Sequence, residues 1–355
     1  MSDERLSVFM APDYSDSNPY QTALIEAIET HEVDITPIEV EGLAPLLSAW
    51  RRNGQPDVVH LHWLHKFITP SGQSTLLSLV LSVRLLFVIL VLRVRGIAII
   101  WTVHNVLDHE RTAPRIETLT RHTVARLADR IIVHCDQAKS IITDAYRLPP
   151  TVAEQIIVIP HGNFEGHYGT PNRVEHQTDL VFLYFGMIRP YKNVPTLIET
   201  FRELEAQDVH LDVVGSPWSE ELAAEIRAAA GDDDRITLEL SFVPDEDVAD
   251  YFERADAVVL PFDRVLTSGS AILAMTFGRP VVAPAYGCLP ELLGEFGGIL
   301  YDETTDRALY RALEKASGDP ELLARMGARN RRVATHLDWA SIGERTVKAY
   351  RSAHI

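Results

Sequence analysis

Short apolar runs alternate with helical patterns along the whole chain, which is typical of parallel α/β sheets. Twelve runs of four to seven residues predict β-strands, six on each side of a polar segment. The first six predicted strands are 6–10, 33–38, 58–62, 98–104, 130–135 and 156–160. The second six are 180–186, 210–215, 236–240, 257–261, 280–283 and 298–301. Helical patterns between them include 20–30, 115–128, 194–206, 219–230, 245–254, 270–277 and 306–317.

The polar segment between the two sets of strands marks a domain boundary. It is rich in Gly, Pro and Asn and separates two complete α/β patterns. We therefore predict an N-terminal domain at 1–165, a linker at 166–178 and a C-terminal domain at 179–335. A last helix at 336–355 is expected to pack back on the first domain. Both domains are predicted to be doubly wound, Rossmann-like parallel sheets, and such sheets bind ligands at the carboxyl ends of their strands.

The segment 76–92 breaks this pattern, because it is almost wholly apolar with Arg84 in its middle. A transmembrane helix here is disfavoured, since a central arginine is costly in lipid and a span would separate the flanking strands of one domain. Two interpretations remain. The segment is either a helix buried against the sheet or a helix lying in the membrane interface, with arginines reaching headgroups over 76–95.

The charge of the chain narrows the classes of partner. With 33 Lys and Arg against 50 Asp and Glu, the net charge is −17, which argues against a nucleic-acid partner. Of the basic residues 28 are arginine and five are lysine, and so acidic a composition with few lysines suggests a halophilic protein. Two cysteines make no disulfide framework, and no secretory signal is visible at the N-terminus. We expect a cytoplasmic location, on the inner face of the cell membrane.

A strand end in the second half carries the strongest chemical signal. The stretch LYFGMIRPYKN at 183–193 ends a strand at Gly186 and places Arg189 and Lys192 at the start of a helix. Glycine permits close approach to the backbone, arginine forks onto phosphate oxygens and a helix N-terminus favours anions. A solvated basic turn is the alternative. The pattern predicts a phosphate site.

The same segment resembles a known family. FGMIRPYKNVPTLIETF is similar to the donor-diphosphate motif of glycosyltransferase family 4, also called glycosyl transferases group 1, which has the two-domain GT-B fold. The later stretches LDVVGSP, SFVPDEDVADYFERADAVVLPF and GRPVVAPAYGCLPELL resemble the family in the same order, so the match covers most of 180–300. The resemblance implies two α/β domains facing across a cleft, a nucleoside diphosphate sugar (GDP- or UDP-sugar) as donor, and donor contacts at Gly215 and Val243.

The chain departs from the family at one position. The family carries two glutamates separated by seven residues, and these positions fall on Val265 and Leu273 here. In their place the motif Thr267-Ser268-Gly269-Ser270 opens an apolar helix. Serine or threonine there can cap the helix, or the hydroxyls and backbone N–H groups can hold the donor diphosphate. We expect the second, and the departure leaves a retaining or an inverting reaction open.

The first half carries polar groups at the ends of its predicted strands. We expect these groups to bind the acceptor, a glycan or lipid-linked saccharide. His104 is the first candidate for a catalytic or sugar-orienting role, with Asp108, His109 or Glu110 as alternative bases. Expected acceptor-side residues are Asn18, His62, Trp63, His104, Asn105, His109, Glu110 and His161.

The predicted activity is glycosyl transfer by a metal-independent, hexosyltransferase-type enzyme without a cofactor. The Asp-x-Asp within GDDDR at 231–235 lies in a helix-to-strand loop and is expected to be solvated rather than metal-binding. Arg189 and Lys192 can neutralise the leaving diphosphate instead, so both are expected to be catalytic. The alternatives are a sugar-nucleotide epimerase of the same fold or a non-catalytic partner subunit.

Overall fold

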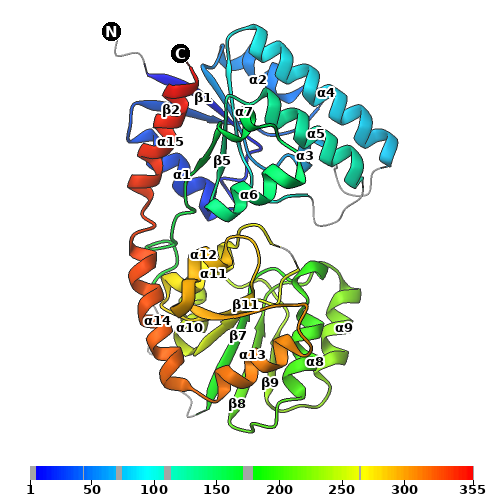
Figure 1. Cartoon of the computed structure of the whole chain (residues 1–355), viewed down its shortest axis with the longest axis vertical. Coiled ribbons are helices and arrows are strands. Elements are labelled where there is room, and N and C mark those ends of the chain that lie inside the picture. Colours follow the sequence, from blue (N-terminus) through cyan, green and yellow to red (C-terminus); the bar gives the residue numbers. More distant parts are fainter. Residues whose placement is uncertain are drawn as a thin grey trace. The chain divides into compact units, whose positions relative to one another are not determined.

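The structure is a computed structural model that describes residues 5–42, 44–68, 74–107, 113–170, 179–263 and 265–354. The chain forms two units (Figure 1). Unit 1 comprises Met1–Gly162 with Asp338–Ile355, and unit 2 comprises Asn163–Leu337. The division therefore lies just ahead of the segment 166–178 in which we expected the linker. Of that segment, residues 171–178 lie outside the described part of the chain.

Unit 1 is built on a parallel sheet in the order β2-β1-β3-β4-β5-β6. Its strands are β1 (Leu6–Ala11), β2 (Val33–Pro37), β3 (Val58–Leu61), β4 (Ala98–Thr102), β5 (Arg130–Val133) and β6 (Ile156–Val158). Its helices are α1 (Pro19–Glu29), α2 (Pro45–Asn53), α3 (His65–Ile68), α4 (Thr75–Val94), α5 (Pro114–Leu127), α6 (Asp136–Ala145), α7 (Pro150–Ala153) and α15 (Trp339–Ala353). The chain order reverses between β1 and β3, which makes their carboxyl ends the switch point of the sheet.

Unit 2 repeats the plan with the order β12-β11-β10-β7-β8-β9. Its strands are β7 (Leu180–Phe185), β8 (Val209–Val214), β9 (Ile236–Glu239), β10 (Ala257–Val259), β11 (Val281–Pro284) and β12 (Gly298–Tyr301). Its α-helices are α8 (Val194–Arg202), α9 (Glu220–Ala230), α10 (Asp245–Arg254), α11 (Gly269–Thr276), α12 (Leu289–Leu293), α13 (Ala308–Ser317) and α14 (Pro320–Thr335). Here the switch point lies between β7 and β10.

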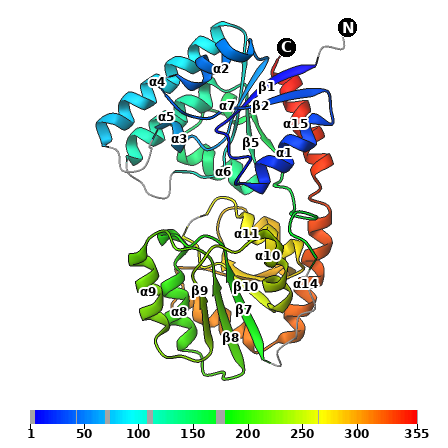
Figure 2. The same cartoon turned by 180° about the vertical axis from the view of Figure 1, so that it is seen from behind.

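Each sheet is covered by helices on both faces, as Figures 1 and 2 show from opposite sides. In unit 2, α8 contacts α9 and α13, whereas α11 contacts α14. The strands are rich in Val, Ile, Leu and Phe because both faces of a parallel sheet are buried. This arrangement confirms the predicted fold class of two doubly wound α/β units, and each of the twelve predicted strands overlaps an observed one.

The last helix belongs to unit 1, although unit 2 precedes it in the chain. Helix α15 packs against α1, and its Ile342, Val347 and Tyr350 join the core of unit 1. Gly343 lies at the closest approach, since a Cβ atom there would stand 2.7 Å from the carbonyl oxygen of Ala27 and 2.9 Å from its Cβ. The contact therefore depends on a residue without a side chain.

Replacing Gly343 by leucine should push α15 away from α1 and lower the melting temperature of unit 1. Overpacking of this kind costs about 1–3 kcal/mol. Thermal unfolding followed by circular dichroism measures the change. Gly318→Ala is the matched control, because a Cβ there meets nothing closer than 3.4 Å. Equal melting temperatures for the two variants would contradict the close packing.

Candidate functional site

The segment that follows β7 folds back over the switch point of unit 2. After Gly186 the chain makes a short 3₁₀ turn at Pro190–Lys192 and enters α8 through Asn193, which has a left-handed φ of 50°. The segment stays joined to the loop after β8, since Trp218 N donates to Ile188 O at 2.8 Å. Arg189 and Lys192 are thereby both placed at the carboxyl end of the sheet.

Two aromatic rings hold these two cations. The guanidinium of Arg189 lies 4.1 Å from the ring centroid of Trp218, and the Nζ atom of Lys192 lies 5.2 Å from that of Phe262. Phe262 follows β10, so Lys192 bridges the two strands of the switch point. Burial and the neighbouring Arg189 lower the pKa of Lys192 to about 8. An anion bound between these cations would relieve both effects.

Gly186 and Gly215 shape the backbone beneath the cations. Their φ angles are 117° and 142°, which L side chains rarely adopt. A Cβ atom on Gly215 would lie 2.1 Å from the carbonyl oxygen of Gly186, so the loops after β7 and β8 can touch only because residue 215 is glycine. The Nζ atom of Lys192 is 3.8 Å from the Cβ position of Gly186. The lysine therefore lies directly over this bare stretch of backbone.

The motif 267–270 follows β10 and opens α11. Ser268 is the helix cap, since its Oγ accepts from the N–H of Ala271 at 3.1 Å and the side chain is buried. Thr267 Oγ1 lies 3.7 Å from the sulfur of Cys288 in the loop after β11. Gly269 and Ser270 form the first turn of the helix and are half-buried. The Ser268 side chain therefore acts as a helix cap. The backbone N–H groups in the first turn of α11 are the groups that suit a diphosphate.

Two positions where the family carries glutamate are closed. Val265 and Leu273 are each 7% exposed and belong to the hydrophobic core of unit 2. Val243, expected to contact the donor, is 8% exposed and packs in the same core. The Val243 side chain therefore contributes to the core, and only the backbone groups of this residue could contact a ligand.

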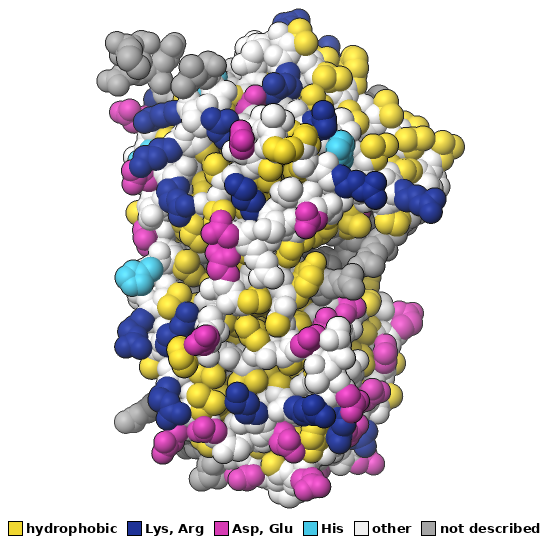
Figure 3. Space-filling view, in the orientation of Figure 1, with side chains coloured by type: hydrophobic (Ala, Val, Ile, Leu, Met, Phe, Trp, Pro, Cys, Tyr) yellow, Lys and Arg dark blue, Asp and Glu magenta, His cyan; other side chains and the backbone are white. Residues whose placement is uncertain are grey.

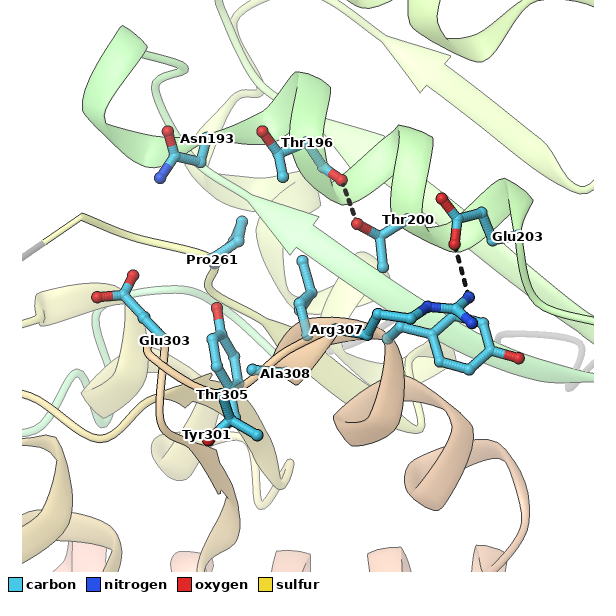
Figure 4. Close-up of a pocket in the computed structure, with 12 residues that line it drawn as sticks. Asn193, Thr196, Thr200, Glu203, Pro261, Tyr301, Glu303, Thr305, Arg307 and Ala308 are labelled. Atoms are coloured by element: carbon cyan, nitrogen blue, oxygen red, sulfur yellow. Dashed lines mark hydrogen bonds and ion pairs between the residues drawn. The ribbon is translucent and has the colours of Figure 1, made fainter.

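A groove of about 330 Å³ lies beside the cation pair (Figure 4). It starts at Asn193 and Pro261, the chain neighbours of Lys192 and Phe262, and runs between α8 and the start of α13. Among the described residues that line it, Arg307 is the cation, and Glu203 binds it at 2.7 Å. The groove is therefore a weaker place for phosphate than the surface at Lys192.

In unit 1, histidines follow the carboxyl ends of four neighbouring strands. They are His62 after β3, His104 after β4, His134 after β5 and His161 after β6. His62 Nδ1 and His104 Nε2 are 3.0 Å apart, so one ring donates a hydrogen bond to the other. The structure thus brings three of the expected acceptor-side histidines together and adds His134 to them.

Aromatic rings enclose this histidine cluster. Trp63 stacks on His104 with ring centroids 4.4 Å apart, and Tyr20 contacts His104 edge-on at 5.2 Å. Trp339 of α15 lies 5.5 Å from Tyr20. His60, on β3 itself, is bonded to Tyr350 and Thr102, each at 2.7 Å.

The cluster is uncharged at neutral pH. Burial lowers the pKa of His60 to about 3, of His134 to about 4 and of His161 to about 3, and neighbouring histidines add to the effect at His60 and His161. The pKa values of His62 and His104 are also lowered well below their usual range, first by burial and then by neighbouring histidines. Backbone carbonyls fix two tautomers, because Nδ1–H of His134 donates to Ile159 O at 2.9 Å and Nδ1–H of His161 donates to Gly162 O at 2.7 Å.

The remaining expected residues have mixed positions. Asn18 caps α1, since its Oδ1 accepts from the N–H of Tyr20 at 3.1 Å, and this places it beside the cluster. The backbone carbonyl of Asn105 accepts from Arg121 at 2.9 Å. His109 and Glu110, like Asp108, lie outside the described residues.

Sequence reasoning missed several members of both sites. His134 could have been found, because it follows a predicted strand as His62 and His104 do. Tyr20 and Trp218 carry no comparable signal. Trp339 and Tyr350 lie more than 175 residues beyond Gly162, where the first part of unit 1 ends. Their place depends on how α15 returns to the first sheet.

In the part of the chain that the structure describes, no three His, Cys, Asp or Glu side chains are grouped as metal ligands. Within GDDDR, Asp233 is bound to Arg235 at 2.7 Å in the loop before β9, at the amino end of the sheet. That carboxylate stabilises its own loop.

Residues 171–333 match the family described as glycosyl transferases group 1. Over 348 residues the chain is 28% identical to GDP-mannose:glycolipid 4-beta-D-mannosyltransferase of Xanthomonas campestris pv. campestris, covering 96% of this chain and 89% of that protein. It is 26% identical to D-inositol 3-phosphate glycosyltransferase of Kineococcus radiotolerans, over 68% of this chain and 61% of that one.

Two solved structures share the fold. Sucrose-phosphate synthase from Thermosynechococcus elongatus aligns with a TM-score of 0.75 at 16% identity, covering 98% of both chains. Anabaena HepE in complex with UDP and glucose aligns with a TM-score of 0.71 at 15% identity, covering 98% of this chain and all of that one (100%). The similarity extends over both units, and it identifies the GT-B fold.

The neutral histidines predict a steep acid limit to stability. Their folded-state pKa values lie below the unfolded value of about 6.5, so below that pH the unfolded chain takes up protons that the folded chain does not. As the pH is lowered from about 6.5 to 4, the free energy of unfolding should fall by about 1.4 kcal/mol per histidine for each pH unit. Urea unfolding at several pH values measures this slope.

Replacing His134 by glutamine should reduce this slope by about 1.4 kcal/mol per pH unit, because one histidine fewer takes up a proton on unfolding. An equal slope in wild type and His134→Gln would contradict a neutral, buried cluster.

Proposed function

We propose that this chain transfers a sugar from a nucleoside diphosphate sugar to a lipid-linked saccharide, because residues 171–333 match glycosyl transferases group 1 and the chain has the GT-B fold. The chain is a glycosyltransferase. The proposal concerns its donor, its acceptor and the residues that serve them. The observation that carries it is the pair of cations over the switch point of unit 2, where a leaving diphosphate would collect negative charge.

The diphosphate is assigned to Arg189 and Lys192. Arginine offers a fork of N–H donors, and an anion bound beside Lys192 would favour the charged form of that lysine. Backbone N–H groups at the start of α11 add further donors. Gly186 and Gly215 leave the backbone bare beneath them. These groups would stabilise the leaving diphosphate without a metal ion, so we propose metal-independent transfer.

The donor is a GDP- or UDP-sugar, and GDP-mannose is the first to test. The Xanthomonas relative that spans nearly the whole chain is named for GDP-mannose and a glycolipid, and a structure of the same fold was solved with UDP. The glycolipid in that name supports a lipid-linked acceptor here. Donor discrimination is expected from the loop at Val243, through backbone groups.

The acceptor is assigned to the histidine cluster of unit 1. Neutral imidazoles beside Trp63 and Tyr20 offer hydrogen bonds to hydroxyl groups and flat apolar faces to a sugar ring. His104 is half-buried, whereas His62 is closed from solvent. We therefore assign to His104 the contact with the acceptor hydroxyl, with His62 fixing its ring.

Helix α4 is proposed to hold the enzyme on the membrane. One face of it exposes large apolar side chains, since Leu76, Val80, Val83, Phe87, Leu90 and Val94 are 71%, 55%, 59%, 63%, 48% and 86% exposed. The hydroxyls of Ser78 and Ser82 face inward and are buried. The inward face also buries Leu85, Val88, Ile89 and Leu92, so the core of unit 1 accounts for one apolar face of the helix and leaves the exposed one unexplained. Figure 3 shows the hydrophobic side chains gathered over this helix.

The helix is long and apolar enough to cross a membrane by length and composition, and the structure argues against a span. Strands β3 and β4, which flank α4 in the chain, are hydrogen-bonded neighbours in one sheet. A span would place them on opposite sides of the bilayer. A helix lying flat in the interface keeps both in place.

Charge favours an anionic membrane surface as the partner of α4. Unit 1 holds 17 Lys and Arg against 20 Asp and Glu, whereas unit 2 holds 16 against 30. Between Glu41 and Asp108 the chain has six basic residues and a single acidic one, Asp57. Acidic residues are thus rare in the sequence around the exposed apolar helix, although Arg93 pairs with Asp129 at 2.8 Å, and we propose a peripheral enzyme on the cytoplasmic face.

Replacing Arg189 or Lys192 by alanine should lower sugar transfer by about two orders of magnitude or more, because each removes charge stabilisation of the leaving group. Transfer from GDP-mannose to a membrane lipid extract is the assay. Melting temperatures should stay near wild type. Arg227→Ala, at an exposed arginine paired with Glu220, is the control and should retain full activity.

The pH dependence of nucleotide binding tests Lys192 itself. Because its pKa is lowered to about 8, GDP should bind more weakly as the pH rises through that value. Lys192→Arg should bind GDP without this loss. Unchanged turnover in Lys192→Ala, or a wild-type affinity that is flat with pH, would refute the donor site.

Replacing Val83 and Phe87 by serine should release the protein from anionic liposomes and leave nucleotide binding intact. Both side chains are exposed, so their loss removes apolar area from the lipid and not from the core. Co-sedimentation with phosphatidylglycerol vesicles measures the effect. Phe296→Ser, at an exposed phenylalanine of unit 2, is the matched control. If the wild type instead forms a dimer that the double variant breaks, α4 binds a second copy and not a membrane.

A further inference from the structure

We propose that Arg121 is a positioning residue for the acceptor, acting through the backbone of the loop that carries His104 and Asn105. The inference rests on the proposed function, because it explains how the acceptor side of unit 1 is held in shape. The loop runs from Val103 to Leu107 after β4, and the chain beyond it lies outside the described residues.

Helix α5 buries an ion pair behind this loop. Glu117 and Arg121 are 0% and 3% exposed and lie one turn apart. Nη2 and Nε of the arginine bind Oε1 of Glu117 at 2.6 and 2.8 Å. The remaining arm, Nη1, donates to the carbonyl oxygen of Asn105 at 2.9 Å. The guanidinium thus joins the helix to the loop.

Tyr146, the residue that ends α6, holds the next peptide group. Its hydroxyl donates to the carbonyl oxygen of Val106 at 2.5 Å. Burial raises the pKa of Tyr146 to about 12, so the hydroxyl keeps its proton. Burial opposes the charge of Arg121, yet Tyr146 and Glu117 outweigh it and raise the pKa of the guanidinium. Both groups are therefore hydrogen-bond donors at neutral pH.

The loop is consequently fixed from two sides. On one side Arg121 and Tyr146 hold two successive carbonyl groups. On the other, the His104 ring stacks on Trp63 and bonds to His62. The start of the loop is tied to the sheet, since Val103 N donates to Ile132 O at 2.9 Å.

A buried ion pair is a poor source of stability, because desolvation of the two charges offsets their attraction. Apolar side chains of similar size would fill the same space. What they could not supply is a donor aimed at a loop carbonyl. The task that remains for Arg121 is orientation, and lysine cannot perform it, because its single ammonium lacks the fork that binds Glu117 and Asn105 together.

The test uses the full-length chain and the variant Arg121→Lys. The kcat/KM for the acceptor should fall about tenfold or more, since small displacements at a reacting centre are costly. The affinity for GDP should stay unchanged, because its proposed site belongs to unit 2. The imidazole NMR signals of His104 should shift, and those of His210 in unit 2 should not.

Arg130→Lys is the matched control. Arg130 also donates to two backbone carbonyls of unit 1, those of Asp129 and Ser352, but it lies at the amino end of β5. It should leave acceptor kinetics and the His104 signals as in wild type. If Arg121→Lys does not fold, the double change Glu117→Met with Arg121→Met removes both charges together and gives the same readings.

A folded Arg121 variant with wild-type His104 signals and wild-type acceptor kcat/KM would overturn the proposal. So would a loss of GDP affinity equal to the loss for the acceptor. If the wild type transfers no sugar to a lipid-linked saccharide, the proposed function fails. The His104 signals then still decide whether Arg121 sets the loop.

Discussion

Both units depend on the constraint that parallel strands joined by crossover helices carry all their carboxyl ends at one edge of the sheet. In each unit the first strand lies inside the sheet, at β1 and at β7, so the connections leave it in both directions. The segments that follow it and its neighbour are then free of crossing helices. The residues assigned to the donor and to the acceptor all follow strands at these edges, although they are far apart in the sequence.

The two edges differ in charge. At β7 and β10 two cations are kept close together over glycines and aromatic rings, which suits a diphosphate. At β3 to β6 five histidines lie close together, four of them buried, and they remain neutral, which suits hydroxyl groups. The acidic unit 2 thus contains a positively charged site, and the nearly neutral unit 1 contains an uncharged one.

Much of this could be predicted from the sequence, and the limits have physical causes. The strands were visible because buried parallel strands are continuous apolar runs, and Arg189 and Lys192 were visible because few cations follow such runs. The orientation of α4 was not visible, because a helix that is apolar on nearly all sides gives no amphipathic signal. Ser268 was ambiguous for a similar reason, since a cap and an anion site use the same residue types. Trp218, Tyr20 and Tyr350 were missed because their contacts arise only when separate loops and helices meet.

The return of α15 to unit 1 has a consequence for synthesis on the ribosome. The chain leaves unit 1 at Gly162 and re-enters it at Asp338, so all of unit 2 emerges before unit 1 is complete. Tyr350, which bonds to His60, and Trp339, which contacts Tyr20, are both made after the whole of unit 2. The core of unit 1 therefore stays incomplete while unit 2 is synthesised, and the histidine cluster can be enclosed only after that.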